Sequence, residues 1–338
     1  MATIPGTAIS RRRVLQQAGR AGLAAGAAAI VGAPSVLRAA TPFTVTTSTL
    51  VGGWGELAND VFVERAYFKK YDFVFRQDQL YNVLATYYAD FAKGAVEIGI
   101  GGWDFFAKVY QKGAPVRIIG IVSTGSMAGF LSAANGPNSL ADLKGKLVSA
   151  MQVSSTYQMT KAWIREFDGL ELEKDIKVQN APNPNATIAL LAANRADAAL
   201  SWEHSLSLGA SKLPGSKVFL NVGDYYKQHT RRTMPYFCIA MNANTIKKLP
   251  KDAVQRIVKA YDDSFKWIEA NPDAYAAKAT KLKVDPAVIK TAMASGRLKL
   301  EMQSMADAKN REDVLYAADI LQKSGFFPKK LDDGLFAA

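Results

Sequence analysis

The feature that most constrains the fold of this chain is an alternation of strand-like and helix-like segments. Residues 43–50 alternate apolar and hydroxyl side chains, as a half-buried strand does, and a helical pattern follows over 55–66. A strand at 73–76, a helix at 82–93 and an apolar strand at 96–100 continue the series. This order predicts a mostly parallel sheet with helices on both faces, in which ligands bind at the carboxyl ends of the strands.

A second series with the same order follows along the chain. The pattern predicts a helix at 156–167, a strand at 176–179, a helix at 186–194 and a strand at 196–202 that ends in Trp202. The first series likewise reaches a tryptophan a few residues after an acid-bearing strand. We therefore expect two α/β lobes whose strand ends face one cleft.

Two strand-like runs, at 125–135 and 235–244, lie between the two series. They are the expected crossings between the lobes, and two crossings form a hinge. We expect lobe 1 to consist of residues 41–128 plus 236–338, and lobe 2 of residues 129–235. The helical segments near the C-terminus carry no chemical motif, so we expect them to pack on lobe 1 as scaffold.

The first 40 residues have the graded order of an export signal. Consecutive arginines at 11–13 precede an Ala/Gly-rich run at 21–33, and small residues follow at Ala39 and Ala40. The run is too short and too weakly apolar to span a bilayer, so we expect cleavage near Ala39–Ala40. The arginines resemble a twin-arginine signal, but Gln16 stands where lysine is more usual, so general secretion stays open. Either route predicts a periplasmic protein; the alternative is a disordered basic tail.

The composition of the remaining chain excludes several functional classes. Residues 1–40 hold five arginines and no acidic residue, so the rest carries 37 basic and 30 acidic residues and a net charge of +7. The absence of a long basic run argues against nucleic-acid binding, while a mild positive field favours small anions. The single Cys238 excludes an intramolecular disulfide, and two histidines are too few for a standard metal site. We expect no metal, no cofactor and no membrane-spanning helix in the mature chain.

The stretch from Leu147 to Tyr157 has the pattern of a ligand site. A short apolar strand leads into Ser154, Ser155 and Thr156, which stand where a helix begins. The unpaired amides of a first helical turn, together with hydroxyl groups, can hold a carboxylate, sulfonate or phosphate. The alternative is plain N-capping of the helix.

Aromatic residues follow several of the predicted strand ends. If Trp54, Trp103, Tyr157 and Trp202 all face the cleft, their flat walls suit an aromatic or heterocyclic solute. The alternative for Trp54 is a place in the core. Glu203 would instead favour a solute with N–H donors, unless its side chain faces solvent.

A set of short motifs occurs in a characteristic order. The motifs are VERAYFKKY at 63–71, KGAVEIGI at 93–100, KGAPV at 112–116, SLADLKGK at 139–146 and ADAA at 196–199. The set resembles the nitrate/sulfonate/taurine family of solute-binding proteins, which includes alkanesulfonate-binding and thiamine-pyrimidine-precursor-binding relatives (NitT/TauT, SsuA/THI5-like). The resemblance implies a type II periplasmic binding protein fold, a monomer that closes on one solute and delivers it to an ABC permease and its ATPase.

Most of the candidate contacts follow from this resemblance, position by position. Trp54 is added because two glycines before it would let a ligand come close to the backbone. The predicted ligand-binding residues are Ser48, Thr49, Trp54, Gly102, Trp103, Ser126, Ser154, Ser155, Thr156, Tyr157, Trp202 and Glu203.

The expected function is therefore the capture of a small organic anion, an aromatic or aliphatic sulfonate or carboxylate, for an ABC importer. The first alternative is a nitrogen heterocycle such as a thiamine pyrimidine precursor. The second is an enzyme on the same fold, with Ser154, His204 and Asp197 as a triad. No Gly-x-Ser-x-Gly elbow occurs, and the cysteine-rich motif of the fungal thiamine-pyrimidine synthases is absent. A sensor subunit that presents its ligand to a membrane receptor fits the sequence equally well.

Overall fold

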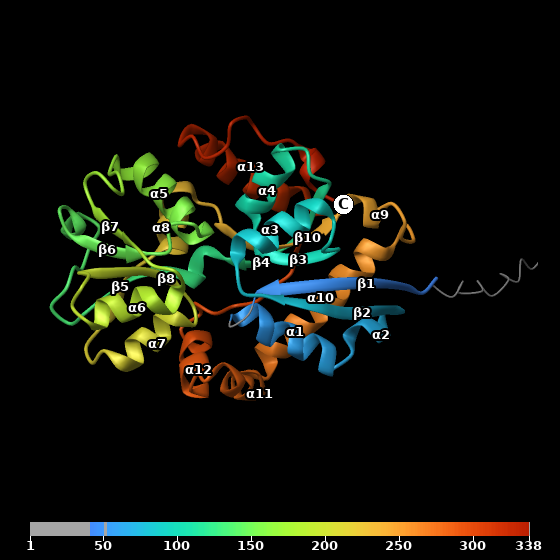
Figure 1. Ribbon diagram of the computed structural model, residues 1–338, viewed down its shortest axis with the longest axis horizontal. Coiled ribbons are helices and arrows are strands. Elements are labelled where there is room, and N and C mark those ends of the chain that lie inside the picture. The colour runs from blue at the N-terminus through green and yellow to red at the C-terminus, as the bar shows by residue number, and fades with distance from the viewer. Residues whose placement is uncertain (1–40, 51–52, 338) are drawn as a thin grey trace, which may run out of the picture. The chain divides into compact units, whose positions relative to one another are not determined.

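The computed structural model describes residues 41–50 and 53–337, which form two β-sheets with helices packed around them (Figure 1). The predicted α/β class is confirmed. The export signal predicted at 1–40 lies outside the described residues. Among the residues that the structure does describe, no helix has the length and apolar character needed to cross a bilayer.

The first sheet has six strands in the order β11-β4-β10-β3-β1-β2. β1 runs parallel to β2 and β3, whereas β10 lies antiparallel between β3 and β4. The strands are β1 (Phe43–Leu50), β2 (Phe73–Tyr81), β3 (Ile98–Gly102), β4 (Val116–Thr124), β10 (Pro235–Asn242) and β11 (Gln303–Ser304). We call the elements built on this sheet lobe 1.

The second sheet has five strands in the order β7-β6-β8-β5-β9. β6 is parallel to β7 and β8, and β5 is antiparallel to both of its neighbours, β8 and β9. The strands are β5 (Ala128–Ser132), β6 (Leu147–Ala150), β7 (Lys177–Asn180), β8 (Ala198–Trp202) and β9 (Lys217–Asn221). We call the elements built on this sheet lobe 2.

The two sheets share one plan, which explains the crossings. Each has three parallel strands, then one antiparallel strand that enters directly after the chain crosses from the other lobe. β5 follows the short helix η1 (Gly125–Met127), and β10 follows α8 (Val222–Thr230). The Gly125 amide donates to the Met234 carbonyl at 3.0 Å, so the two crossings lie side by side. The strand-like runs predicted as crossings are thus mostly sheet strands, and the connections themselves are shorter.

The helices before the second crossing begin and end where their caps allow. Asn183 caps α6, and Pro184 occupies the first turn, where its missing N–H costs nothing. Gly94 and Gly169 end α3 and α5 in the left-handed conformation that glycine tolerates best. The helices are α1 (Trp54–Glu64), α2 (Tyr67–Lys70), α3 (Leu84–Lys93), α4 (Trp103–Gln111), η2 (Ala141–Leu143), α5 (Ser155–Asp168), α6 (Pro184–Ala192) and α7 (Ser205–Lys212).

The C-terminal helices do not all pack on lobe 1. α10 lies against α1 and α2 of lobe 1, as predicted, but α12 packs against α7 of lobe 2 (Figure 1). The expected packing on lobe 1 is thus found for α10, whereas α12 and α13 also contact lobe 2, through α7 and α5. The segments are α9 (Ala243–Ile246), α10 (Ala253–Ala270), α11 (Pro272–Ala277), η3 (Lys278–Leu282), α12 (Pro286–Ala294), α13 (Ala308–Lys323) and η4 (Asp333–Leu335).

Candidate functional site

The N-termini of α4 in lobe 1 and α5 in lobe 2 meet directly. The Ser155 hydroxyl donates a hydrogen bond of 2.6 Å to Oδ1 of Asp104. A Cβ atom added to Gly102, which precedes α4, would lie 1.7 Å from Ser155 Oγ. Only glycine fits at this position, so the two predicted residues Gly102 and Ser155 are brought together. We call this region, with Asp104, the α4–α5 contact.

Asp104 is the most unusual group in the α4–α5 contact. Its side chain is fully buried, and within the described part of the chain Oδ2 has no hydrogen-bond partner. Burial raises the pKa of this carboxyl to about 7, although the hydrogen bond from Ser155 opposes the rise. The carboxyl group therefore changes charge near neutral pH.

A second polar link joins the lobes one residue further along α5. The Thr156 hydroxyl hydrogen-bonds the Tyr236 hydroxyl at the start of β10, and both side chains are buried. The rings of Tyr236 and Phe237 pack with their centroids 4.2 Å apart, and those of Phe237 and Trp54 with their centroids 5.3 Å apart. Trp54 and Thr156, both predicted site residues, thus belong to one chain of contacts across the interface.

Ser154 has partners within its own helix turn. Its hydroxyl accepts from the Tyr157 amide at 3.2 Å and donates to the Met151 carbonyl at 2.7 Å. The Ser154 side chain is therefore an N-cap in this structure, and the amides and hydroxyls of Ser155 and Thr156 carry the remaining polarity of the helix start.

Of the other predicted aromatic residues, two are fully buried and one is partly exposed. The Trp103 indole donates to the Pro235 carbonyl at 2.9 Å, and the Tyr157 hydroxyl donates to Glu173 at 2.7 Å. These contacts hold both rings within the packed interior. Trp202, at the end of β8, is half-buried. The structure thus gives Trp202 the most accessible ring of the four.

The remaining small polar candidates lie at a strand end and in the connection between the two sheets. Ser48 and Thr49 are buried at the end of β1. Ser126, in the η1 crossing, accepts a hydrogen bond from Thr124 Oγ1 at 3.2 Å, and its carbonyl accepts from Asn221 at 2.8 Å. Ser126 therefore lies in the first connection between the two sheets, close to the crossing predicted from the sequence.

Glu203 has a protein cation as its partner. Its carboxylate is 1 % exposed and lies 2.5 Å from Nε of Arg297, which follows α12. Ser207 adds an amide at 3.0 Å and a hydroxyl at 3.1 Å, and this hydroxyl also accepts from Arg297. Arg297 thus occupies the place that the sequence interpretation gave to a donor group of the solute. We call this cluster and the α7–α12 packing beside it the α7–α12 contact.

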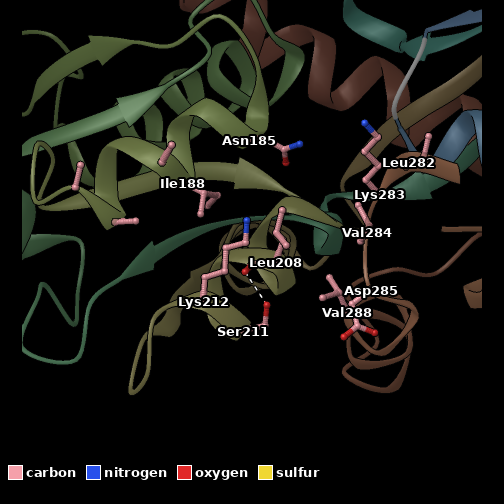
Figure 2. A pocket seen from close by; sticks show the side chains of 13 residues that line it. Asn185, Ile188, Leu208, Ser211, Lys212, Leu282, Lys283, Val284, Asp285 and Val288 are labelled. Carbon is pink, nitrogen blue, oxygen red and sulfur yellow. Dashed lines mark hydrogen bonds between the residues drawn. The ribbon is translucent and has the colours of Figure 1, made fainter. Parts of the chain in front are cut away.

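A groove with a volume of about 780 Å³ lies beside the α7–α12 contact (Figure 2). Figure 2 shows one wall formed by lobe 2 residues such as Ile188 and Leu208, and the other by Leu282, Val284 and Val288. None of the predicted ligand-binding residues lines this groove. It is mainly apolar, with Asn185, Ser211, Lys212, Lys283 and Asp285 as its polar members.

The hypothetical triad is not assembled. Asp197 precedes β8 and accepts a hydrogen bond from the Leu147 amide, whereas His204 follows β8 and Ser154 caps α5. Burial lowers the His204 pKa, and its Nδ1 atom has no partner among the described residues. Within 41–50 and 53–337, no cluster of three or more His, Cys, Asp or Glu residues could hold a metal ion.

Three important residues were not in the predicted set: Asp104, Tyr236 and Arg297. Asp104 could have been selected, because it is an acidic residue directly after Gly-Gly-Trp at the end of a predicted strand. Tyr236 begins a predicted crossing strand and gives no chemical signal of its own. Arg297 lies 94 residues from Glu203 in the sequence, and no motif connects the two.

Comparisons with known proteins agree on one fold. A family model described as NMT1/THI5 like matches residues 85–275. The alkanesulfonate-binding protein SsuA from Xanthomonas axonopodis pv. citri, bound to MOPS, is 15 % identical with a TM-score of 0.68, over 85 % of this chain and 95 % of that one. The aliphatic sulphonate binding protein SsuA from Escherichia coli is 17 % identical with a TM-score of 0.71, over 86 % and 96 %. No curated protein matches the chain.

A third structure widens the comparison beyond bacteria. A Candida albicans protein described as having the generic periplasmic binding protein fold is 12 % identical, with a TM-score of 0.57 over 86 % of this chain and 93 % of that one. The structural likeness establishes the expected fold, a periplasmic binding protein architecture of two α/β lobes.

Proposed function

Because the chain belongs to the NMT1/THI5-like family, we propose that it is the solute-binding component of an ABC importer, which captures a small organic anion between its two lobes. The observation that carries the proposal is the α4–α5 contact. It places two helix N-termini from different lobes, with Ser155 and Thr156, at one buried interface. Unpaired first-turn amides favour negative charge, so a sulfonate or carboxylate is the best match.

The relatives support the same solute class. The two bacterial structures compared above are sulfonate-binding proteins by their descriptions, and one of them is bound to MOPS, an alkanesulfonate. For this chain, an aromatic or aliphatic sulfonate or carboxylate is the proposed ligand. Ser48, Thr49, Ser126 and Trp202 are the further proposed contacts, at strand ends and at the hinge between the lobes.

The second candidate is a nitrogen heterocycle, and Asp104 favours it. A buried carboxylate oxygen without a partner is a suitable acceptor for a ring N–H or an amino group. Glu203, which suggested this class in the sequence, is paired with Arg297 instead.

The proposed setting is the periplasm, with an ABC permease and ATPase as partners. We propose that residues 1–40 direct export and are removed, that residues 41–128 plus 236–338 and residues 129–235 move as the two lobes, and that the protein is monomeric. A catalytic role receives no support from the separated Ser154, His204 and Asp197.

The test uses the mature protein, residues 41–338. Mass spectrometry would identify any co-purifying small molecule, and a thermal-shift screen would cover sulfonates, aromatic carboxylates, nitrate and pyrimidines. A ligand that binds the folded protein raises its melting temperature by mass action. At a ligand concentration of 100 times Kd, the free energy of unfolding rises by about 2.7 kcal/mol. A sulfonate or carboxylate hit supports the main proposal, and a hit with pyrimidines alone supports the second candidate. No hit in any class, or a solute returned chemically changed, contradicts the proposal.

A matched pair of variants tests the location of the site. Trp202→Ala should weaken binding of a screened hit more than tenfold, because Trp202 is half-buried at a strand end of the interface. Trp267→Ala, in α10 of lobe 1, removes an equally large, partly exposed indole outside the interface and should leave affinity unchanged. Equal losses in both variants would place the solute elsewhere.

A further inference from the structure

The start of α5 already has an anionic group next to it, and that group belongs to the protein. Asp104 from lobe 1 accepts a hydrogen bond of 2.6 Å from the Ser155 hydroxyl, at the helix start that the sequence offers as a candidate anion cradle. The carboxyl group therefore takes the position expected for the acidic end of a solute.

This arrangement leaves half of the carboxyl group unsatisfied. Oδ1 has its hydrogen bond, but Oδ2 is buried without a partner among the described residues. An ionised oxygen in such a place is costly, because burial removes water and nothing replaces it. The closed contact is thus favourable with a neutral Asp104 and strained with a charged one.

The groups around Asp104 give little compensation for a negative charge. The Ser155 hydroxyl, the backbone amides of Phe105 and Asp104 at the start of α4, and the Lys108 cation all lower the Asp104 pKa, yet burial outweighs them. The other titratable neighbours are Tyr88 on α3 and Tyr236 and Cys238 on β10, whose own pKa values are raised by burial, with Asp104 adding to the rise. All three stay neutral at physiological pH, so Asp104 is the group that titrates.

We propose that Asp104 sets the charge specificity of the interlobe site, because its carboxylate occupies the α5 cradle and competes there with the acidic group of a solute. The competition rests on the proposed solute-binding function. A solute with a neutral polar group at the α5 start is not repelled by the Asp104 carboxylate. A sulfonate or carboxylate binds well only when Asp104 is neutral, either by protonation or by substitution.

The binding test uses Asp104→Asn, which removes the charge and keeps the shape, and Asp78→Asn as control. Asp78 is an exposed acid on β2 of lobe 1, so the control loses the same net charge at a position that is exposed to water. The probes are benzenesulfonate and the uncharged benzamide, titrated calorimetrically at pH 8.0 and 5.5. Asp104→Asn should bind benzenesulfonate at least tenfold more tightly than wild type at pH 8.0, with a smaller gain at pH 5.5. Benzamide affinity should change less than threefold.

A weaker or unchanged affinity of Asp104→Asn for benzenesulfonate at pH 8.0 would overturn the proposal, as would an equal gain in Asp78→Asn. Should neither probe bind any of the proteins, the proposed solute class is in error, and a measurement without solute decides on Asp104.

That second measurement is small-angle X-ray scattering of the solute-free proteins. Wild type should become more expanded between pH 5.5 and 8.0, because charging Asp104 strains the α4–α5 contact. Asp104→Asn should have the same radius of gyration at pH 5.5 and pH 8.0. Asp78→Asn should expand with pH as wild type does. Identical profiles for wild type and Asp104→Asn would refute the role of Asp104 whatever the solute is.

Discussion

The two sides of the interlobe interface are built differently. At the α4–α5 contact, small groups and hydroxyls meet so closely that Gly102 has no room for a methyl group. The buried acid there accepts from neutral groups, the Ser155 hydroxyl and backbone amides at the start of α4. At the α7–α12 contact, the buried acid Glu203 has a full guanidinium partner, and a groove of about 780 Å³ remains open beside it. The difference shows which side can respond to charge. A carboxylate in an ion pair holds its structure, whereas a buried carboxylate outside any ion pair is sensitive to protons and to solutes.

The largest loss of stability is expected when the Glu203–Arg297 ion pair of the α7–α12 contact is removed. Arg297→Ala leaves the Glu203 carboxylate buried with only Ser207 as donor, so the free energy of unfolding should fall by about 3–5 kcal/mol. Urea unfolding of the solute-free protein measures this. Lys290→Ala, which removes an exposed ion pair with Asp273, is the control and should cost less than about 1 kcal/mol. Equal losses in the two variants would mean that the α7–α12 ion pair does not hold the lobes.

The α4–α5 contact, whose acid Asp104 has no ion pair, should make the stability of the protein depend on pH. The Asp104 pKa is raised from 3.8 to about 7 by burial, so its contribution to stability is present at acidic pH and is lost as the pH rises toward 7. The stability of wild type should fall by about 2–4 kcal/mol more than that of Asp104→Asn between pH 4 and pH 8. Unfolding curves at several pH values measure it. Parallel curves for the two proteins would show that Asp104 keeps its ordinary pKa.

The next effect comes from adding volume on each side of the interlobe interface, at Gly102 and at Ala192. In Gly102→Ala the new methyl group would lie 1.7 Å from Ser155 Oγ and 2.8 Å from Ser155 Cβ, so a rotation of the serine side chain cannot remove the clash. We expect a loss of about 1–3 kcal/mol and a more expanded molecule in solution scattering. Ala192→Leu adds more volume, but on the exposed wall of the groove, and should change stability by less than about 0.5 kcal/mol. A tolerated Gly102→Ala would mean that the α4–α5 contact is loose.

The smallest effect concerns the helix cap beside the cradle. Ser154→Ala removes the hydroxyl that accepts from the Tyr157 amide, and should cost about 1 kcal/mol. Asn183→Ala, the cap of α6, lies away from the α4–α5 contact and should cost about the same. Thermal unfolding of the solute-free variants compares them. If Ser154→Ala lowers solute affinity much more than Asn183→Ala does, Ser154 contacts the solute as well as capping α5.

Much of the fold could be predicted because its signals are local. The β1 segment alternates apolar and hydroxyl side chains over its whole length, and the predicted bounds 43–50 agree with the strand. The α5 start follows from its serine cap, which lies within three residues of its partner. The same kind of signal failed for β9, whose five residues are all partly exposed and carry no clear alternation of burial.

The site was harder to predict because it depends on distant residues. Glu203 was predicted to favour a solute with N–H donors, yet its partner in the structure is Arg297, which lies on a segment that the sequence assigned to scaffold. Trp103 directly follows β3 and Trp202 is the last residue of β8, but the Pro235 carbonyl fixes the Trp103 indole inside the fold. A position at the end of a strand indicates that a side chain lies near the interface. Only the tertiary contacts show whether that side chain is held by protein groups or is free to contact a solute.

The most direct test of the central claim is solution scattering of the mature wild-type protein with and without a solute found by the thermal-shift screen. Closure of two lobes on a ligand predicts a smaller radius of gyration in the complex, and Gly102→Ala should show a reduced change, because its methyl group holds the α4–α5 contact apart. A solute that binds tightly without changing the radius of gyration of wild type would contradict capture by closure between the lobes.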